Sequence, residues 1–188
     1  MFIQTEETPN PATMKFLPGR AVLSQGTLDV ADVSLAHLSP LAEALFKIEG
    51  VKGFFLAHEF VTVTKTTDKE WPLLKPAILT TLMEHYTNNR PILAEAHEGS
   101  TALETPAPAA DDNDVVRQIR EILDMKVRPA VAQDGGDITF QSFEDGIVYL
   151  HLKGSCAGCP SSTATLKSGI ENMLKHYIPE VREVRQMR

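Results

Sequence analysis

The sequence predicts an α+β or α/β fold class: two small domains, each a small sheet with helices packed on it, joined by a flexible linker. Three observations support this prediction. Strand-like and helix-like segments alternate in both halves of the chain, a segment rich in Ala, Pro, Glu and Thr separates the halves, and 188 residues suffice for two small domains. We therefore assign residues 1–88 to an N-terminal domain, 89–112 to the linker and 113–188 to a C-terminal domain.

Turn residues and hydrophobic periodicity define the elements of the N-terminal domain. Thr8-Pro9-Asn10-Pro11 predicts a turn between two strands, because each proline fixes φ. Ser39 followed by Pro40 predicts the start of a helix, and Gly50 predicts its end. A β-hairpin and a longer helix that reaches Tyr86 follow. The predicted strands are residues 1–5, 14–17, 51–56 and 60–64.

The predicted linker has the composition of a solvated segment. Residues 91–110 carry three acidic residues and no Lys or Arg, and they show no sustained apolar period. The step Pro106-Ala107-Pro108 is unfavourable for both helix and sheet. We therefore expect a flexible or semi-extended tether here.

The C-terminal domain is predicted to begin with a helix over residues 115–127 that ends before Pro129. Glu144-Asp145-Gly146 then predicts a hairpin loop between strands 138–143 and 147–153. A further helix follows Pro160 and reaches Tyr177, and residues 181–184 predict a closing strand. This order of elements favours helices packed on a small mixed sheet.

Composition and charge exclude several classes of function. Hydrophobic residues make up 43% and charged residues 23%, which is typical of globular proteins. The formal net charge of −7 argues against binding to nucleic acid. No apolar run approaches the ~18 residues of a membrane span, and the first residues lack a basic or Arg-rich targeting segment. We therefore expect a cytoplasmic protein, or one that has already been processed, that binds neither membranes nor nucleic acid.

Cys156 and Cys159 are the only cysteines, and only two residues separate them, so no disulfide framework can connect distant segments of the chain. They lie in a loop between a predicted strand and a predicted helix. Pro160 suits the first helical position, which would place Cys159 at the N-cap, where amide groups and the helix dipole stabilise a thiolate. The small residues Ala157 and Gly158 leave backbone N–H groups free to bond sulfur. The pair therefore predicts metal binding or thiol chemistry.

Four interpretations of the cysteine pair remain open from the residues alone. A structural zinc site needs about four protein ligands, but the chain offers two thiols and six scattered histidines. A thioredoxin-type dithiol usually follows a bulky residue and often encloses a proline, whereas here Ser155 precedes the pair and Pro160 follows it. An iron–sulfur cluster takes four thiolates, which two copies in a symmetric dimer would supply. The fourth is an incidental pair of small buried thiols.

Three segments of the C-terminal half together carry a resemblance to a known family. The cysteine loop 154–162, the upstream segment 131–137 and the helix 115–127 resemble the C-terminal domain of NifU-like (Nfu-type) iron–sulfur proteins. Residues 1–19 and 39–55 resemble the separate N-terminal Nfu domain. The two resemblances follow each other in the expected order and cover nearly the whole chain except the linker.

The resemblance implies a scaffold or carrier that is not an enzyme. It implies that a [4Fe-4S] cluster, shared between two subunits of a homodimer, is ligated by Cys156 and Cys159 and transferred to apo-protein recipients after an upstream donor has supplied it. The N-terminal domain has no cysteine, and partner contact is its implied role. A CxxC dithiol–disulfide oxidoreductase is the alternative. No catalytic residues are assigned, because no Ser/His/Asp order or Gly-rich phosphate loop stands out.

Three further features have both a functional and a structural interpretation. The segment Asp134-Gly135-Gly136-Asp137 could position the cysteine loop, but we interpret it as a turn that needs positive φ. Trp71 could anchor a partner, but we expect it in the core. Arg182, Arg185 and Arg188 could dock an acidic recipient, but we expect a solvated face.

Overall fold

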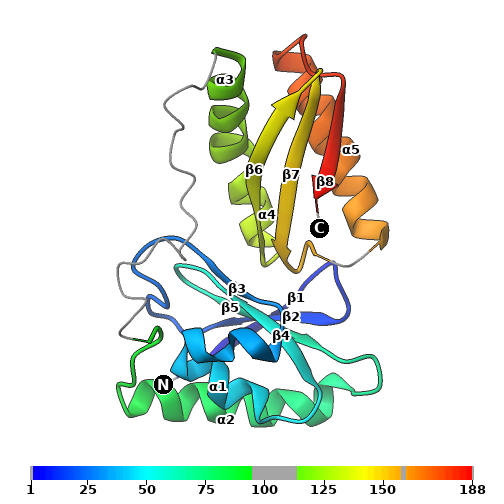
Figure 1. Cartoon of the computed structure of the whole chain (residues 1–188). Coiled ribbons are helices and arrows are strands. Elements are labelled where there is room, and N and C mark those ends of the chain that lie inside the picture. The colour runs from blue at the N-terminus through cyan, green and yellow to red at the C-terminus, as the bar shows by residue number, and fades with distance from the viewer. Residues whose placement is uncertain (1, 95–113, 158–159, 188) are drawn as a thin grey trace. The chain divides into compact units, whose positions relative to one another are not determined.

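A computed structural model describes residues 2–94, 114–157 and 160–187 of the chain (Figure 1). It divides into two compact units, Met1–Thr105 and Pro106–Arg188, each of which combines a sheet with helices. The predicted fold class, two small domains of mixed α and β structure, is therefore confirmed. Most of the predicted linker, residues 95–112, lies outside the described residues.

The first unit contains a five-stranded sheet with the order β1-β2-β5-β4-β3, in which all neighbouring strands are antiparallel. The strands are β1 (Gln4–Glu7), β2 (Thr13–Leu17), β3 (Leu28–Val30), β4 (Val51–Leu56) and β5 (Val61–Lys65). The predicted hairpin is confirmed as β4–β5, and the predicted turn does join β1 to β2, although β1 begins three residues later than predicted. Strand β3 and the 3₁₀ helix η1 (Val33–Leu38) were not predicted, because each is too short to show a clear period.

Helices α1 (Pro40–Phe46) and α2 (Trp71–Thr87) complete the first unit (Figure 1). The Ser39 side chain accepts a hydrogen bond from the Ala42 backbone N–H at 3.2 Å, as its predicted role as N-cap requires. The core combines both helices with the sheet. Its largest fully buried side chains include Phe16, Leu41, Leu45, Leu56, Ile78 and Leu82.

The chain that leaves α2 folds back onto the first unit. Ile92 and Leu93 pack against its core, and the Ala94 backbone N–H donates to the Leu38 carbonyl oxygen at 3.0 Å. The Ser39 hydroxyl donates to the carbonyl oxygen of Ile92. Residues 92–94, which the sequence analysis assigns to the linker, therefore contribute to the packing of the first unit.

The second unit contains a three-stranded sheet with the order β6-β7-β8. Strands β6 (Gly136–Glu144) and β7 (Ile147–Gly154) form the predicted hairpin, and Asp145 and Gly146 take φ values of 51° and 80° in its turn. Strand β8 (Glu183–Met187) is parallel to β7, so the sheet is mixed, as predicted. The closing strand begins two residues later than expected.

The first helical segment of the second unit continues past its predicted end. It comprises α3 (Asp114–Ile122), a π-helical turn η3 (Leu123–Val127) and α4 (Arg128–Gln133). The predicted stop before Pro129 is wrong, because the helix continues through it: Pro129 is the second residue of α4 and directly follows the π-helical turn. Helix α5 (Pro160–Tyr177) links β7 to β8. Among the described helices, none is long and apolar enough to cross a membrane.

Candidate metal centre

The cysteine loop begins where β7 ends. Gly154 takes a φ of 62°, and Cys156 lies two residues later with only 6% of its surface exposed, packed within the apolar core of the second unit. The Ser155 backbone N–H donates to the Gly135 carbonyl oxygen at 3.2 Å, and the Ser155 hydroxyl donates to the Asp134 carbonyl oxygen. The loop is thus attached to the turn that precedes β6.

Gly136 lies in close contact with the Cys156 thiol. It is paired with Gly154 across the β6–β7 ladder. A Cβ atom added at Gly136 would lie 2.6 Å from Cys156 Sγ and 2.7 Å from the Lys153 carbonyl oxygen, and contacts this short do not occur without displacement. The absence of a side chain at this position therefore makes room for the thiol.

This contact revises the interpretation of the segment from Asp134 to Asp137. Asp134 and Gly135 do form a turn, with Gly135 at a φ of 81°, but Gly136 and Asp137 belong to strand β6. The segment therefore combines the two roles weighed from the sequence, a turn and a support for the cysteine loop.

Burial also controls the protonation of Cys156. Desolvation raises the pKa of its thiol to about 11, the hydrogen bond with Ser155 lowers this pKa in part, and the charges of Asp134 and Asp137 raise it further. The sulfur is therefore a neutral thiol near pH 7. Because metals bind the thiolate, ligation by Cys156 must release a proton.

Cys159 lies outside the described residues, so its predicted N-cap position stays a prediction. Helix α5 does begin at Pro160, as expected from the sequence. Within the described part of the chain, no group of three or more His, Cys, Asp or Glu side chains could hold a metal ion. The described residues thus offer Cys156 as a soft sulfur donor that suits iron–sulfur chemistry or zinc, without a complete set of ligands.

An ion-pair cluster next to the site was not predicted. Arg128 Nε and Nη2 donate to the two carboxylate oxygens of Asp137 at 2.9 and 3.0 Å, and Arg128 Nη1 donates to Asp124 Oδ1 at 3.2 Å. The bonds to Asp137 are the main reason why the pKa of Arg128 is raised. The only signal in the sequence is the i,i+4 spacing of Asp124 and Arg128, because the bond to Asp137 joins a helix to a strand.

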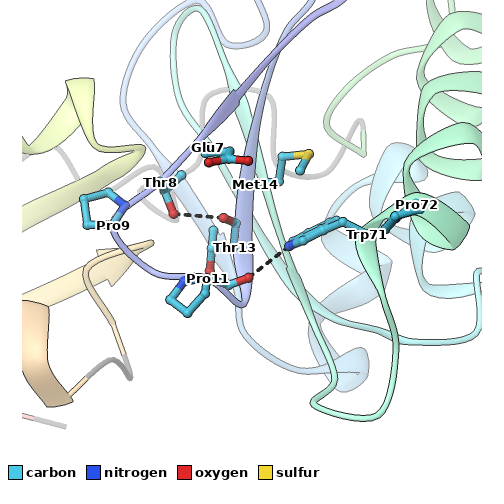
Figure 2. Close-up of a pocket in the computed structure, with 8 residues that line it drawn as sticks. All are labelled: Glu7, Thr8, Pro9, Pro11, Thr13, Met14, Trp71 and Pro72. Carbon is cyan, nitrogen blue, oxygen red and sulfur yellow. Dashed lines mark hydrogen bonds between the residues drawn. The ribbon is translucent and has the colours of Figure 1, made fainter.

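Trp71 lies apart from the cysteine loop in sequence, in the first unit. It packs partly buried against the core, and its indole N–H donates to the Pro11 carbonyl oxygen at 2.9 Å. Figure 2 shows that it also borders a pocket of about 410 Å³, which Glu7, Thr8, Pro9 and other residues of the β1–β2 turn line. Trp71 therefore packs against the core, as expected, and also lines a surface pocket.

Two of the three arginines of the predicted basic face lie in the described residues, and each makes a hydrogen bond. The Arg182 backbone N–H donates to the Gly146 carbonyl oxygen at 2.7 Å. Arg185 forms two hydrogen bonds of 3.0 Å with the Glu183 carboxylate, which neutralises part of the positive charge. Arg188 lies outside the described residues.

Comparison with protein-family models finds both domains. Residues 3–89 match the model described as scaffold protein Nfu/NifU N terminal, and residues 119–185 match the NifU-like domain. The two matches follow each other in the order expected from the sequence.

Curated relatives match along the whole chain. The human protein named "NFU1 iron-sulfur cluster scaffold homolog, mitochondrial" is 49% identical over 191 residues, which cover 100% of this chain and 72% of the human protein. A Drosophila willistoni protein of the same name is 47% identical over 188 residues, covering 100% of this chain and 64% of that protein. The chain thus spans about two thirds of the length of these relatives.

A solved structure is also similar. The solution NMR structure of a NifU-like protein from Saccharomyces cerevisiae superposes with a TM-score of 0.46 at 22% identity and covers 50% of this chain and 86% of that one. The assignment itself rests on the two domain models and on the identity of nearly one half to relatives over the full chain. On these grounds, the chain belongs to the Nfu/NifU family of iron–sulfur cluster scaffold proteins.

Proposed function

We propose that two copies of this chain hold one [4Fe-4S] cluster between them and pass it to apo-proteins. Cys156 and Cys159 of each copy would supply the four thiolate ligands that such a cluster usually takes. The observation that carries the proposal is the Cys156 thiol, which stands between the end of β7 and the start of α5 in a chain with only one other cysteine. Because one chain supplies half of the ligands, a symmetric dimer completes the set.

The cluster is cargo in this proposal, and the chain's own groups control its entry and exit. During loading, each cysteine thiol gives up its proton and replaces a sulfur ligand of the upstream donor. Burial opposes this deprotonation at Cys156, so the site has little tendency to attract stray cations when no cluster is offered. When the dimer interface opens, thiols of the recipient can replace the cysteines in turn.

The first domain is proposed to contact recipients and donors, because it carries no cysteine. The chain would therefore act as a carrier and not as an enzyme. The relatives' names place those proteins in mitochondria, and the cytoplasmic location expected from the sequence remains a prediction.

A dithiol–disulfide oxidoreductase is the competing function. An attacking cysteine in such enzymes needs a lowered pKa, whereas burial raises the pKa of Cys156 to about 11. This difference argues against Cys156 as the attacking thiol of a disulfide exchange.

Anaerobic reconstitution with iron and sulfide, followed by native mass spectrometry, tests the proposal. We expect four irons and four sulfides per two chains, and neither in Cys156→Ser. A monomer without metal, or one with zinc alone, would overturn the proposal. Disulfide reduction by that monomer would support the oxidoreductase.

A further inference from the structure

The ion-pair cluster of Asp124, Arg128 and Asp137 spans the chain from the π-helical turn η3 to the first residues of β6. Asp137 is only 5% exposed, and both of its carboxylate oxygens accept hydrogen bonds from Arg128. A paired, planar contact of this kind fixes direction as well as distance, which a lysine could not do. Arg128 therefore holds Asp137 in one orientation.

Asp137 in turn is directly joined to the residue that supports the thiol. It follows Gly136, whose backbone lies so close to Cys156 Sγ that no Cβ fits between them. The preceding turn accepts two hydrogen bonds from Ser155, one at the Gly135 carbonyl oxygen and one at the Asp134 carbonyl oxygen. A shift of Asp137 would thus move the backbone on which the cysteine loop rests.

The connection between Arg128 and Asp137 is short, so the loss of one contact can change its geometry. Arg128 is the first residue of the six-residue helix α4, and Asp137 is the second residue of β6, nine positions later. The bidentate pair closes this short connection into a loop. Asp124, which lies in η3, accepts a further hydrogen bond from Arg128 and so orients its guanidinium group.

We propose that Arg128 is a positioning residue for Cys156. It acts through Asp137 to hold the Gly135–Gly136 backbone as the support of the thiol, and so determines how well Cys156 is shielded without a cluster and how long a cluster is retained. The shielding stands on the geometry alone, whereas the retention rests on the proposed function.

The first test measures shielding in the full chain without a cluster. In a Cys159→Ser background, Cys156 is the single thiol. Because iodoacetamide alkylates the thiolate, its rate is measured over a pH series and expressed per thiolate, and this corrected rate reports the exposure of Cys156. We expect Arg128→Gln to accelerate alkylation about tenfold, because a hydrogen bond to a charged group contributes roughly that factor to an equilibrium. Arg128→Lys should accelerate it less. An unchanged rate in Arg128→Gln would overturn the proposal.

A matched control separates positioning from general stability. Lys175 pairs with Glu171 at 2.6 Å near the far end of α5, so Lys175→Gln removes an ion pair of the same unit away from the loop. We expect Lys175→Gln to leave the alkylation rate unchanged. The rate in Arg128→Gln should also depend little on low urea concentrations, because local opening exposes little surface. A steep dependence equal to that of global unfolding would reject positioning.

Two further variants show whether Arg128 acts through Asp137. Asp137→Asn keeps the shape of the side chain and removes its charge, so it also replaces Arg128→Gln if that variant does not fold. The double variant Arg128→Gln with Asp137→Asn should be alkylated no faster than the faster single variant. Rates that multiply in the double variant would contradict the proposed route.

The second test measures retention in chains with both cysteines. After anaerobic reconstitution, we expect a ferrous chelator to remove iron several-fold faster from Arg128→Gln than from wild type, with Lys175→Gln like wild type. Equal rates of removal would reject the role in retention. If wild type itself takes up no cluster, the proposed function fails, whereas the alkylation result still decides the shielding.

Discussion

Each of the two domains buries titratable side chains, but in different settings. In the first domain, His85 and Tyr86 are 2% and 6% exposed near the end of α2, and within the described structure His85 Nε2 and the Tyr86 hydroxyl have no hydrogen-bond partner. In the second, Cys156 is equally buried, but it lies in a loop beside a turn. The unpartnered polar atoms of His85 and Tyr86 therefore cost stability, whereas local opening of its loop can expose the buried Cys156 thiol.

Removal of the Cys156 sulfur should have the largest effect. In Cys156→Ser, we expect complete loss of iron and sulfide after reconstitution, because a hydroxyl is a poor ligand for iron in a cluster. Metal and sulfide analysis of all the reconstituted protein, after removal of unbound iron, measures this loss. Tyr86→Phe, a change of one buried atom in the other domain, should retain full loading, and a loss of iron there would break the comparison.

The first domain should become less stable at alkaline pH. Burial raises the pKa of Tyr86 from 10.0 to about 12, while the positive charge of Arg20 lowers it in part. A folded-state pKa above the unfolded value gives a stability that is complete below pH 10 and disappears as pH rises through about 12. The loss is on the order of 2 kcal/mol. Urea unfolding between pH 8 and pH 12 measures it.

Tyr86→Phe provides the control for this pH dependence. It removes a buried hydroxyl for which the described structure shows no partner, so at pH 7 the variant should be at least as stable as wild type. An alkaline loss that is as large in Tyr86→Phe as in wild type would assign the effect to another group.

A methyl group at Gly136 should affect the second domain alone. In Gly136→Ala, the new Cβ meets both Cys156 Sγ and a backbone oxygen, so we expect a loss of about 1–3 kcal/mol in unfolding free energy, with less iron bound. Gly169→Ala is the matched control, because its Cβ meets nothing within 4 Å on α5. That control should gain about 0.5–1 kcal/mol in thermal or urea unfolding. Unchanged stability together with normal loading in Gly136→Ala would contradict this prediction.

The smallest expected effect concerns Trp71. Trp71→Phe keeps an aromatic ring but removes the hydrogen bond to the Pro11 carbonyl oxygen, so we expect a loss of about 0.5–1.5 kcal/mol in the first domain. Differential scanning calorimetry measures it. Iron loading should stay at the wild-type level, since the cysteines lie in the other domain. Reduced loading would show that the two domains depend on each other.

The predictable parts of the fold were those with local causes. The hairpin β6–β7 follows from the Asp145-Gly146 turn, and α1 follows from Ser39 and Pro40, because each signal acts on its neighbours in sequence. The continuation through Pro129 could not be predicted in this way. It depends on a π-helical turn that places the proline in a new first turn.

The candidate site likewise has features that local sequence predicts and features that it does not. The spacing of Cys156 and Cys159 identifies a chelating pair, since it is a local pattern. The contact between Gly136 and Cys156 joins residues 20 positions apart and depends on the register of the β6–β7 ladder. The bond from Arg128 to Asp137 depends likewise on how a helix docks on a strand. Such contacts follow from tertiary packing, which the local patterns of a sequence do not reveal.

The burial of Cys156 also determines how the cluster-free chain meets oxidants. Peroxide attacks thiolates, and it converts them first to sulfenic acid and then to forms that cannot be reduced again. A thiol that is 6% exposed and neutral at pH 7 presents little thiolate to such reagents. A chain waiting for its cargo can therefore keep this ligand chemically intact, and oxidative damage to Cys156 would be confined to the brief periods in which the loop opens.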